Sequence, residues 1–307
     1  MGLFLIRRRH VFDRQNGWDD ADSSSHPCHH SRVTDLPPGV QSQFDEWELT
    51  LDGPVTQGSA STVVAVRTSD GAPAVLKLAS PNVESEHEHL ALRRWGGVGA
   101  VRLLRADPHR RALLVERLST QSLDTLWDVE ACEVVAALYR RIHVPALPQL
   151  RSLATVVEQW VRDFEDLPRG APIPHRLVEQ AIAAARELTS DHDAGVVLHG
   201  DLHYRKVLAG DRETWSVIGP KPLNGDPHFE IAPMLWHRWD ELEGYVRAGI
   251  RTRLHALVEA AGFDEARARG WVLVRVVHQA VRSLVDQSTS GPAELTKYVA
   301  LAKAVQD

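Results

Sequence analysis

The spacing of apolar residues changes near Ser119, and this change restricts the chain to a fold with two unlike parts. Between Trp47 and Leu118, apolar residues form short runs separated by glycine, proline and aspartate, a pattern typical of β-strands. After Ser119 they recur every three or four residues, which is typical of helices that bury one face. The sequence therefore predicts an α+β fold, with a small β-rich lobe followed by a larger helical lobe.

The β-rich part is expected to contain a set of short strands and one helix. The strands are predicted over residues 47–51, 62–68, 74–79, 101–106 and 111–118, and the helix over residues 83–95. Asp70-Gly71 between two apolar runs predicts a tight hairpin turn, because both residues tolerate a positive φ. Gly96-Gly97 predicts the end of the helix.

The helical part has one interruption, over residues 196–227. Helices are predicted over residues 129–143, 150–167, 175–189, 230–239, 242–261, 266–287 and 292–305. The interruption holds β-type runs at 196–198, 207–208 and 215–218, with clustered histidine, aspartate and glycine. Such an insertion in a helical lobe is the expected place of a functional site. By contrast, His278 lies on an apolar helix face, which predicts a hydrogen-bonded core histidine.

Residues 1–45 predict a flexible leader that contributes little to the core, because their early part is rich in serine and aspartate and poor in apolar residues. His26, Cys28, His29 and His30 in this leader have two interpretations, a metal cluster or a solvent-exposed polar tail. The second is favoured, because a zinc site needs ligands held by folded structure. The domains expected are this leader, an N-terminal lobe over 46–118 and a helical lobe over 119–307.

Composition excludes several classes of protein. The 35 basic and 41 acidic residues give a formal charge of −6, which argues against binding nucleic acid through bulk positive charge. Two cysteines cannot form a secreted disulfide framework. No stretch approaches the roughly 18 apolar residues that a membrane span needs. We expect a cytoplasmic monomer or dimer without nucleic-acid or membrane partners.

The most informative segment is His199-Gly200-Asp201-Leu202-His203, inside the interruption. Further informative segments are 91–97 (ALRRWGG), 100–104 (AVRLL), 114–118 (LVERL), 215–221 (WSVIGPK) and Gly225-Asp226-Pro227. Taken together in their order along the chain, these segments resemble the aminoglycoside phosphotransferases, specifically the streptomycin 6-kinase and hydroxyurea kinase branch. The resemblance runs from about Trp47 to the C-terminus. The resemblance implies a bilobal protein-kinase-like fold that binds ATP between its lobes. It also implies a small-molecule acceptor, a hydroxyl of an aminocyclitol or similar polar molecule.

The resemblance assigns roles to residues on both sides of the expected cleft. Asp201 matches the aspartate that orients the acceptor hydroxyl and takes its proton. Lys77 matches the lysine that contacts the α- and β-phosphates and pairs with a helix glutamate. Glu88 is the candidate partner and Glu84 the alternative. If Lys77 were only an edge-strand charge, it would instead point to water.

Two further segments would contact ATP. Gly58 and Ser59 belong to a turn that matches the phosphate-covering turn, although its single glycine is a weak signal. The segment from Glu116 to Leu118 matches the hinge, whose backbone contacts the adenine.

Acceptor recognition is expected in the helical lobe, where relatives use carboxylates to pair with cationic antibiotics. The candidates are Asp240, Glu241 and Asp286, although for each one taken singly a solvated helix face is the favoured interpretation. Trp236, Trp239 and Trp271 could stack on a ring or belong to the core.

Two positions depart from the pattern, and they are the two that hold magnesium in the family. Lys206 stands where an asparagine is expected, and Gly219 stands where an aspartate is expected. Magnesium needs oxygen ligands, and neither side chain offers one. A phosphotransferase impaired by this loss is therefore expected, with a catalytically inactive pseudokinase as the alternative.

Three more possibilities stay open. In one, the Lys206 ammonium stands in for a cation while Asp226 or Glu230 reaches a remaining metal. In another, the gene has decayed or the clone is altered. In the third, the chain is a homoserine- or choline-kinase-like enzyme, which would share the fold and differ in its acceptor pocket.

Overall fold

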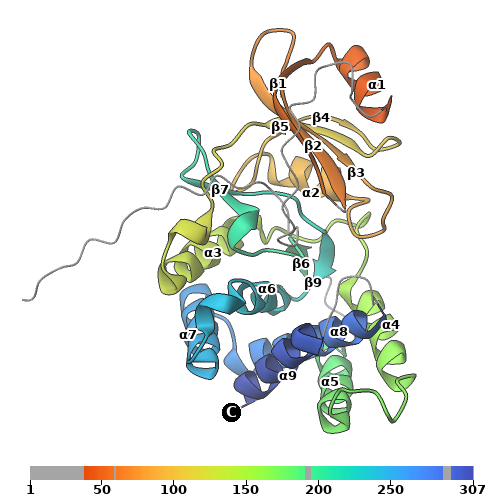
Figure 1. Ribbon diagram of the computed structural model, residues 1–307, viewed down its shortest axis with the longest axis vertical. Helices are drawn as coiled ribbons and strands as arrows, with labels where there is room; N and C mark the ends of the chain where they lie inside the picture. Colours follow the sequence, from red (N-terminus) through yellow and green to blue (C-terminus); the bar gives the residue numbers. More distant parts are fainter. Residues whose placement is uncertain (1–37, 59, 191–194, 286–291, 307) are drawn as a thin grey trace, which may run out of the picture.

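The computed structural model describes residues 38–306, except residue 59 and residues 191–194 and 286–291. A β-sheet lobe lies above a helical lobe in Figure 1, and the segments between β6 and β9 lie where the two meet. This is the α+β, two-lobed arrangement that the sequence predicts. The cluster His26, Cys28, His29 and His30 lies outside the described residues.

The upper lobe is built on a five-stranded antiparallel sheet in the order β1-β2-β3-β5-β4. Its strands are β1 (Thr50–Gln57), β2 (Ser61–Arg67), β3 (Pro73–Ala79), β4 (Leu103–Asp107) and β5 (Ala112–Glu116). The predicted hairpin turn joins β2 to β3, and Gly71 adopts a φ of 82° there. Turn chemistry thus fixes the register of the two strands beside it.

A helix, α1 (Pro38–Trp47), covers one face of this sheet. Val40, Phe44 and Trp47 are buried against alternate residues of the sheet, such as Val64 and Leu76. The expectation that the leader runs to residue 45 and adds little to the core is therefore wrong for residues 38–45. The strand predicted over 47–51 also begins later, because Trp47 belongs to the helix.

The opposite face of the sheet is covered by α2 (Glu88–Trp95), which ends at the left-handed Gly96. Ala91, Leu92 and Trp95 are buried in the same core as Leu113 of β5. The helix begins later than predicted because Asn82 holds the preceding segment in a turn. The Asn82 side chain accepts hydrogen bonds from the backbone N–H and the hydroxyl of Ser85, both within 2.9 Å.

The helices of the helical lobe pack around a main core and a smaller second one. The helices are α3 (Asp128–Ile142), α4 (Leu153–Glu165), α5 (His175–Leu188), α6 (Ala232–Trp236), α7 (Val246–Ala261), α8 (Glu265–Val285) and α9 (Pro292–Gln306). The helix predicted over 230–239 is broken into a 3₁₀ helix (Pro227–Ile231), the short α6 and a second 3₁₀ helix (Trp239–Leu242). The break lies at Arg238, whose φ of 55° cannot continue a right-handed helix. In the described part of the chain, every helix is too short or too polar to span a bilayer.

The interruption of the helical lobe forms two small antiparallel ribbons. β6 (Val196–Leu198) pairs with β9 (Leu223–Gly225), and β7 (Val207–Ala209) pairs with β8 (Trp215–Val217). The second ribbon reaches the upper lobe, because Val101 N–H donates to the carbonyl of Val217 at 2.9 Å. The loops between these strands are therefore held at the junction of the lobes.

Candidate active site

On the upper side of the junction, Lys77 of β3 and Glu88 of α2 form an ion pair. The Lys77 ammonium lies 2.9 and 2.8 Å from the two carboxylate oxygens of Glu88, whose side chain is only 4% exposed. Residue alternation explains the direction: Leu76 packs toward α1, whereas Lys77 lies opposite Leu113, on the face that α2 covers. Of the two candidate partners, Glu88 makes this contact.

On the lower side, the loop at His199 and Gly200 is fixed from beneath by a buried carboxylate. Glu230 accepts hydrogen bonds from the backbone N–H groups of both residues. Arg275, also buried, donates to the carbonyl of Gly200 at 2.8 Å. Burial raises the pKa of Glu230 to about 7, although Arg275 and the two N–H groups oppose the shift.

Only glycine fits at position 200 of the loop. Its φ is +80°, and a Cβ there would lie 2.2 Å from the carbonyl oxygen of Lys221. The two segments that carry Asp201 and Lys221 can therefore approach each other only because residue 200 has no side chain.

The ring of His199 links the loop to the segment at Ile218. Its Nδ1 accepts a hydrogen bond from the N–H of Asp201 at 3.3 Å, so the Nε2–H donates to the Ile218 carbonyl at 3.0 Å. Burial lowers the pKa of His199 to about 3, so the ring is neutral near pH 7. Its contacts position the loop and leave no nitrogen for proton transfer.

Asp201 faces a cluster of positive charge. Its carboxylate lies 3.3 Å from the ammonium of Lys221, which lies 3.3 Å from Glu84 as well. Burial acts to raise the pKa of Asp201, but Lys221 first, then His203 and Lys206, hold it below its usual range. The carboxylate is thus ionised and keeps 21% of its surface exposed.

Lys206 and Gly219 lie side by side between Asp201 and Lys77. The backbone N–H of Ile218 donates to the carbonyl of Lys206 at 2.9 Å. A Cβ on Gly219 would stand 3.5 Å from the Lys206 ammonium and 3.7 Å from the Lys77 ammonium. The two positions at which the sequence departs from the expected motif are therefore adjacent here, and ammonium groups converge on them.

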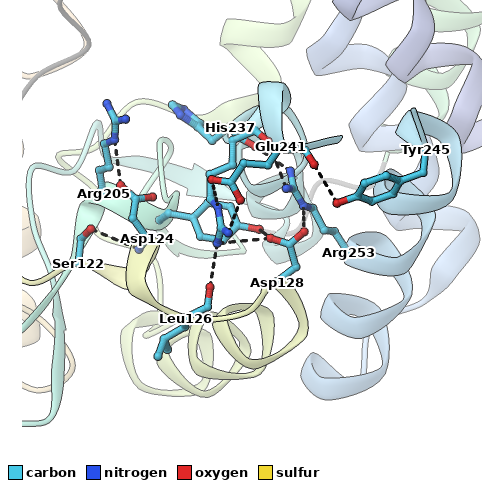
Figure 2. A network of polar contacts seen from close by, with 11 residues as sticks. Ser122, Asp124, Leu126, Asp128, Arg205, His237, Glu241, Tyr245 and Arg253 are labelled. Carbon is cyan, nitrogen blue, oxygen red and sulfur yellow. Dashed lines mark hydrogen bonds and ion pairs between the residues drawn. The ribbon is translucent and has the colours of Figure 1, made fainter. Parts of the chain in front are cut away.

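A polar network supports the turn that carries Lys206 (Figure 2). Tyr204 donates to one carboxylate oxygen of Asp128 at 3.0 Å, and the fully buried Arg253 donates to the other at 2.8 Å. Arg253 also donates to the carbonyl of His237 at 2.7 Å, and Arg238 lies 3.4 Å from Asp128. The 3₁₀ helix Tyr204–Lys206 is thereby tied to α3 and α7.

The residues at the junction do not fit a magnesium ion. Within the described ranges, no group of three or more acidic, histidine or cysteine side chains is arranged to hold a metal. Glu230 is used by the loop, and Asp226 caps the 3₁₀ helix Pro227–Ile231 by accepting from the N–H of His228 at 3.0 Å. Asp226 also accepts from Trp271 at 2.6 Å. Neither of these two carboxylates is free to reach the junction.

The other described residues that the sequence predicts to contact ATP make contacts within the fold. The N–H of Gly58 donates to the carbonyl of Ser61 at 2.9 Å and closes the turn between β1 and β2, while Ser59 lies outside the described residues. The carboxylate of Glu116 pairs with Arg212 at 2.5 Å, so its side chain serves the fold. Leu118 is partly buried against the core of the helical lobe. None of these contacts tests the predicted role of the backbone in this segment.

The acceptor candidates are exposed or lie outside the described chain. Asp240 and Glu241 are exposed on the 3₁₀ helix Trp239–Leu242, and Glu241 pairs with Arg238. Asp286 lies outside the described residues.

The aromatic candidates belong to the core. Trp236 is buried in the main core of the helical lobe, and Trp239 is partly buried against it. Trp271 is buried in a second core cluster. His278 stacks on Trp160 with ring centroids 3.8 Å apart, and its Nδ1 has no hydrogen-bond partner among the residues described. The expected hydrogen bond is therefore wrong for that nitrogen.

Lys221 is the site residue to which the sequence assigns no role. Its signal is its place in the segment Gly219-Pro220-Lys221, two residues after a position at which the sequence departs from the expected motif. The structure brings this lysine to Asp201.

Comparisons with known proteins agree with this arrangement. Residues 46–287 match the family described as aminoglycoside/hydroxyurea antibiotic resistance kinase. The streptomycin 6-kinase of Streptomyces glaucescens is 38% identical, over 88% of this chain and 90% of its own length. The hydroxyurea phosphotransferase of Kitasatospora aureofaciens is 36% identical, over 85% of this chain and 76% of its own. A crystal structure of an aminoglycoside phosphotransferase shares the fold, with a TM-score of 0.62, 15% identity and coverage of 87% and 98%.

Proposed function

Since this chain belongs to the aminoglycoside/hydroxyurea antibiotic resistance kinase family, we propose that it transfers the γ-phosphoryl group of ATP to a hydroxyl of a streptomycin-like aminoglycoside. The observation that carries the proposal is the ionised Asp201 at the junction of the lobes, held 3.3 Å from Lys221 and near Lys206. Lys206 in turn stands beside Lys77. One carboxylate and several ammonium groups thus meet in one place, which is what phosphoryl transfer to a hydroxyl requires.

Asp201 acts on the acceptor. It accepts a hydrogen bond from the hydroxyl and directs the oxygen toward the γ-phosphorus. The new oxygen–phosphorus bond forms as the bond to the β,γ-bridging oxygen breaks, and ADP leaves with that electron pair. The hydroxyl proton passes to Asp201. Because the low pKa makes Asp201 a weak base, its main contribution is orientation, and the proton moves late.

The lysines act on ATP. Lys77, fixed by Glu88, is placed to contact the inner phosphates, and Lys206 and Lys221 supply positive charge between them and Asp201. Positive charge held in advance lowers the cost of charge that develops on the phosphoryl group. The charges named here belong to the chain itself, and no step is routed through a metal.

Asp240 and Glu241 remain the candidates for a cationic acceptor. Both are exposed, and the pairing of Glu241 with Arg238 is a surface interaction that a competing cation can replace at small cost. Asp286 remains a candidate for acceptor binding on the basis of the sequence alone.

Nucleotide binding without transfer is the second candidate function. It is favoured by one observation, the absence of a fit for magnesium among the described residues at Lys206 and Gly219. Loss of electrostatic stabilisation of this kind commonly costs several kcal/mol of barrier, so under the first proposal we expect transfer to be slow, and under this one we expect none.

The test is product analysis. Protein, ATP and streptomycin are incubated together, and the drug is examined by mass spectrometry and phosphorus NMR, with hydroxyurea as the alternative acceptor. A phosphate ester on a streptomycin hydroxyl supports the first proposal. Bound ATP with no phosphorylated product of either compound supports the second.

A further inference from the structure

Of the lysines that supply positive charge at the junction of the lobes, Lys206 differs from Lys77 and Lys221 in its contacts. Lys77 is paired with Glu88, and Lys221 lies between Asp201 and Glu84. Lys206, by contrast, forms no ion pair or side-chain hydrogen bond with any residue that the structure describes. Burial first, and then Lys77 and Lys221, lower its pKa, although Asp201 and Glu88 oppose this.

The position of Lys206 is built into the fold. Its backbone N–H donates to the His203 carbonyl at 2.8 Å, and its own carbonyl accepts from Ile218 at 2.9 Å. The preceding Tyr204 is held by Asp128 at 3.0 Å. The ammonium therefore reaches the junction from a supported turn.

Gly219 completes the arrangement by leaving space. The point where its Cβ would stand lies within 3.7 Å of both the Lys206 and the Lys77 ammonium nitrogens. A side chain of any length there would occupy the space between these two cations. The two departures from the family pattern thus act together, since one brings a cation and the other makes room beside it.

An anion is the ligand that such a site recognises. A part-buried cation that forms no direct ion pair is costly, and a phosphate oxygen between two ammonium groups removes that cost through charge-assisted hydrogen bonds. The triphosphate of ATP carries several negative charges and normally reaches kinases together with magnesium. Magnesium would bring a further positive charge against Lys206, and neither Lys206 nor Gly219 offers an oxygen ligand to hold it.

We propose that Lys206 replaces the divalent cation, so that this site binds the triphosphate of ATP free of metal, with Lys206 and Lys77 on either side of it. The inference rests on the proposed function for the placement of ATP at this junction. It adds that magnesium weakens nucleotide binding in this chain, because magnesium-bound ATP has fewer negative charges and presents a cation to Lys206.

The first experiment measures ATP affinity by isothermal titration calorimetry, in excess EDTA and in saturating magnesium. The expected result is binding in EDTA that weakens severalfold when magnesium is added. Lys206→Met is expected to weaken binding in EDTA by about tenfold or more, as expected when a charge-assisted contact is lost. Arg205→Met is the matched control, because it removes an exposed cation from the same turn, one that pairs with Asp124 at 3.0 Å.

A second variant converts the site. Gly219 has a φ of +60°, a conformation that aspartate adopts more readily than most residues. Lys206→Asn with Gly219→Asp is therefore expected to fold, to bind ATP weakly in EDTA and to regain affinity when magnesium is added. Circular dichroism of each variant checks that the fold is kept.

The outcomes separate this inference from the proposed function. Wild-type protein that binds ATP about tenfold more tightly with magnesium than in EDTA would overturn the inference, even if streptomycin is phosphorylated. Equal loss in Lys206→Met and Arg205→Met would overturn it as well. Metal-free binding of ATP with no transfer to any acceptor would leave the inference standing and remove the proposed transferase function.

Discussion

Replacing Glu88 by glutamine tests the ion pair that joins β3 to α2. Both carboxylate oxygens of Glu88 hold the Lys77 ammonium within 2.9 Å, and the glutamate side chain is almost fully buried. Glutamine keeps the shape and one acceptor but removes the charge. Lys77 would then be left beside Lys206 without a counter-charge.

The expected loss can be worked from the geometry. At 2.8 Å and an effective dielectric constant of about 20, the attraction is about 6 kcal/mol before the cost of desolvation is subtracted. Removing one partner of a fully buried pair costs about 3–5 kcal/mol. Because Lys77 keeps 22% of its surface in water and glutamine retains one hydrogen bond, we expect Glu88→Gln to lower the free energy of unfolding by about 2 kcal/mol.

The assay is urea unfolding followed by tryptophan fluorescence, together with ATP titration of each variant. Glu84→Gln is the control, because Glu84 is 46% exposed and its contacts with Lys221 and Arg282 are 3.3 and 3.4 Å long. That variant should lose no more than about 1 kcal/mol. ATP affinity should fall by about tenfold in Glu88→Gln, because Lys77 is no longer held in place. Equal stability and affinity of the two variants would refute the reasoning.

Two further predictions concern buried titratable groups. Burial lowers the pKa of His143 to about 4 and of His199 and His278 to about 3, from 6.5. Below pH 6.5 the unfolded chain therefore binds more protons than the folded protein, and the free energy of unfolding decreases as the pH is lowered. Glu230 has the opposite effect: because its pKa is raised to about 7, its carboxyl binds a proton in the folded protein at a higher pH than in the unfolded chain. Burial and then His237 also lower the pKa of His203, which adds to the loss. The net loss between pH 6.5 and pH 5 is therefore at least about 3 kcal/mol, measured by urea unfolding, and unchanged stability would contradict it. Burial raises the pKa of Cys132 to about 12, so mass spectrometry should find it unmodified by iodoacetamide until the protein unfolds.

The parts of the fold that the sequence predicts well are those with local causes. The β2–β3 hairpin follows from Asp70-Gly71, and the end of α2 follows from Gly96. The helix α1 is not predicted because Val40, Phe44 and Trp47 are spaced by four and three residues among polar neighbours, a helical pattern that is short and lies next to a polar segment. The strand β9 (Leu223–Gly225) is not predicted, because Leu223 is the only large apolar residue among its three residues and no β-type run stands out there.

The site shows the same division. The segment at His199 and the strand that carries Lys77 indicate which residues meet, and Glu88 lies four residues after its alternative, Glu84. The supports of the loop could not be predicted, because they join residues far apart in the chain. Glu230 lies 31 residues from His199, and Arg253 lies 125 residues from Asp128. Such pairs arise from tertiary packing, which no local pattern records.

The most direct test of the proposed role of Asp201 is the rate of phosphoryl transfer from labelled ATP to streptomycin, compared between the wild-type protein and Asp201→Asn. The asparagine keeps the size of the side chain and removes the carboxylate that orients the hydroxyl. We expect slow transfer by the wild-type protein and a rate at least about 100-fold lower in the variant, with ATP affinity retained. Equal rates of transfer in the two proteins would contradict the assignment of Asp201, and with it the proposed mechanism.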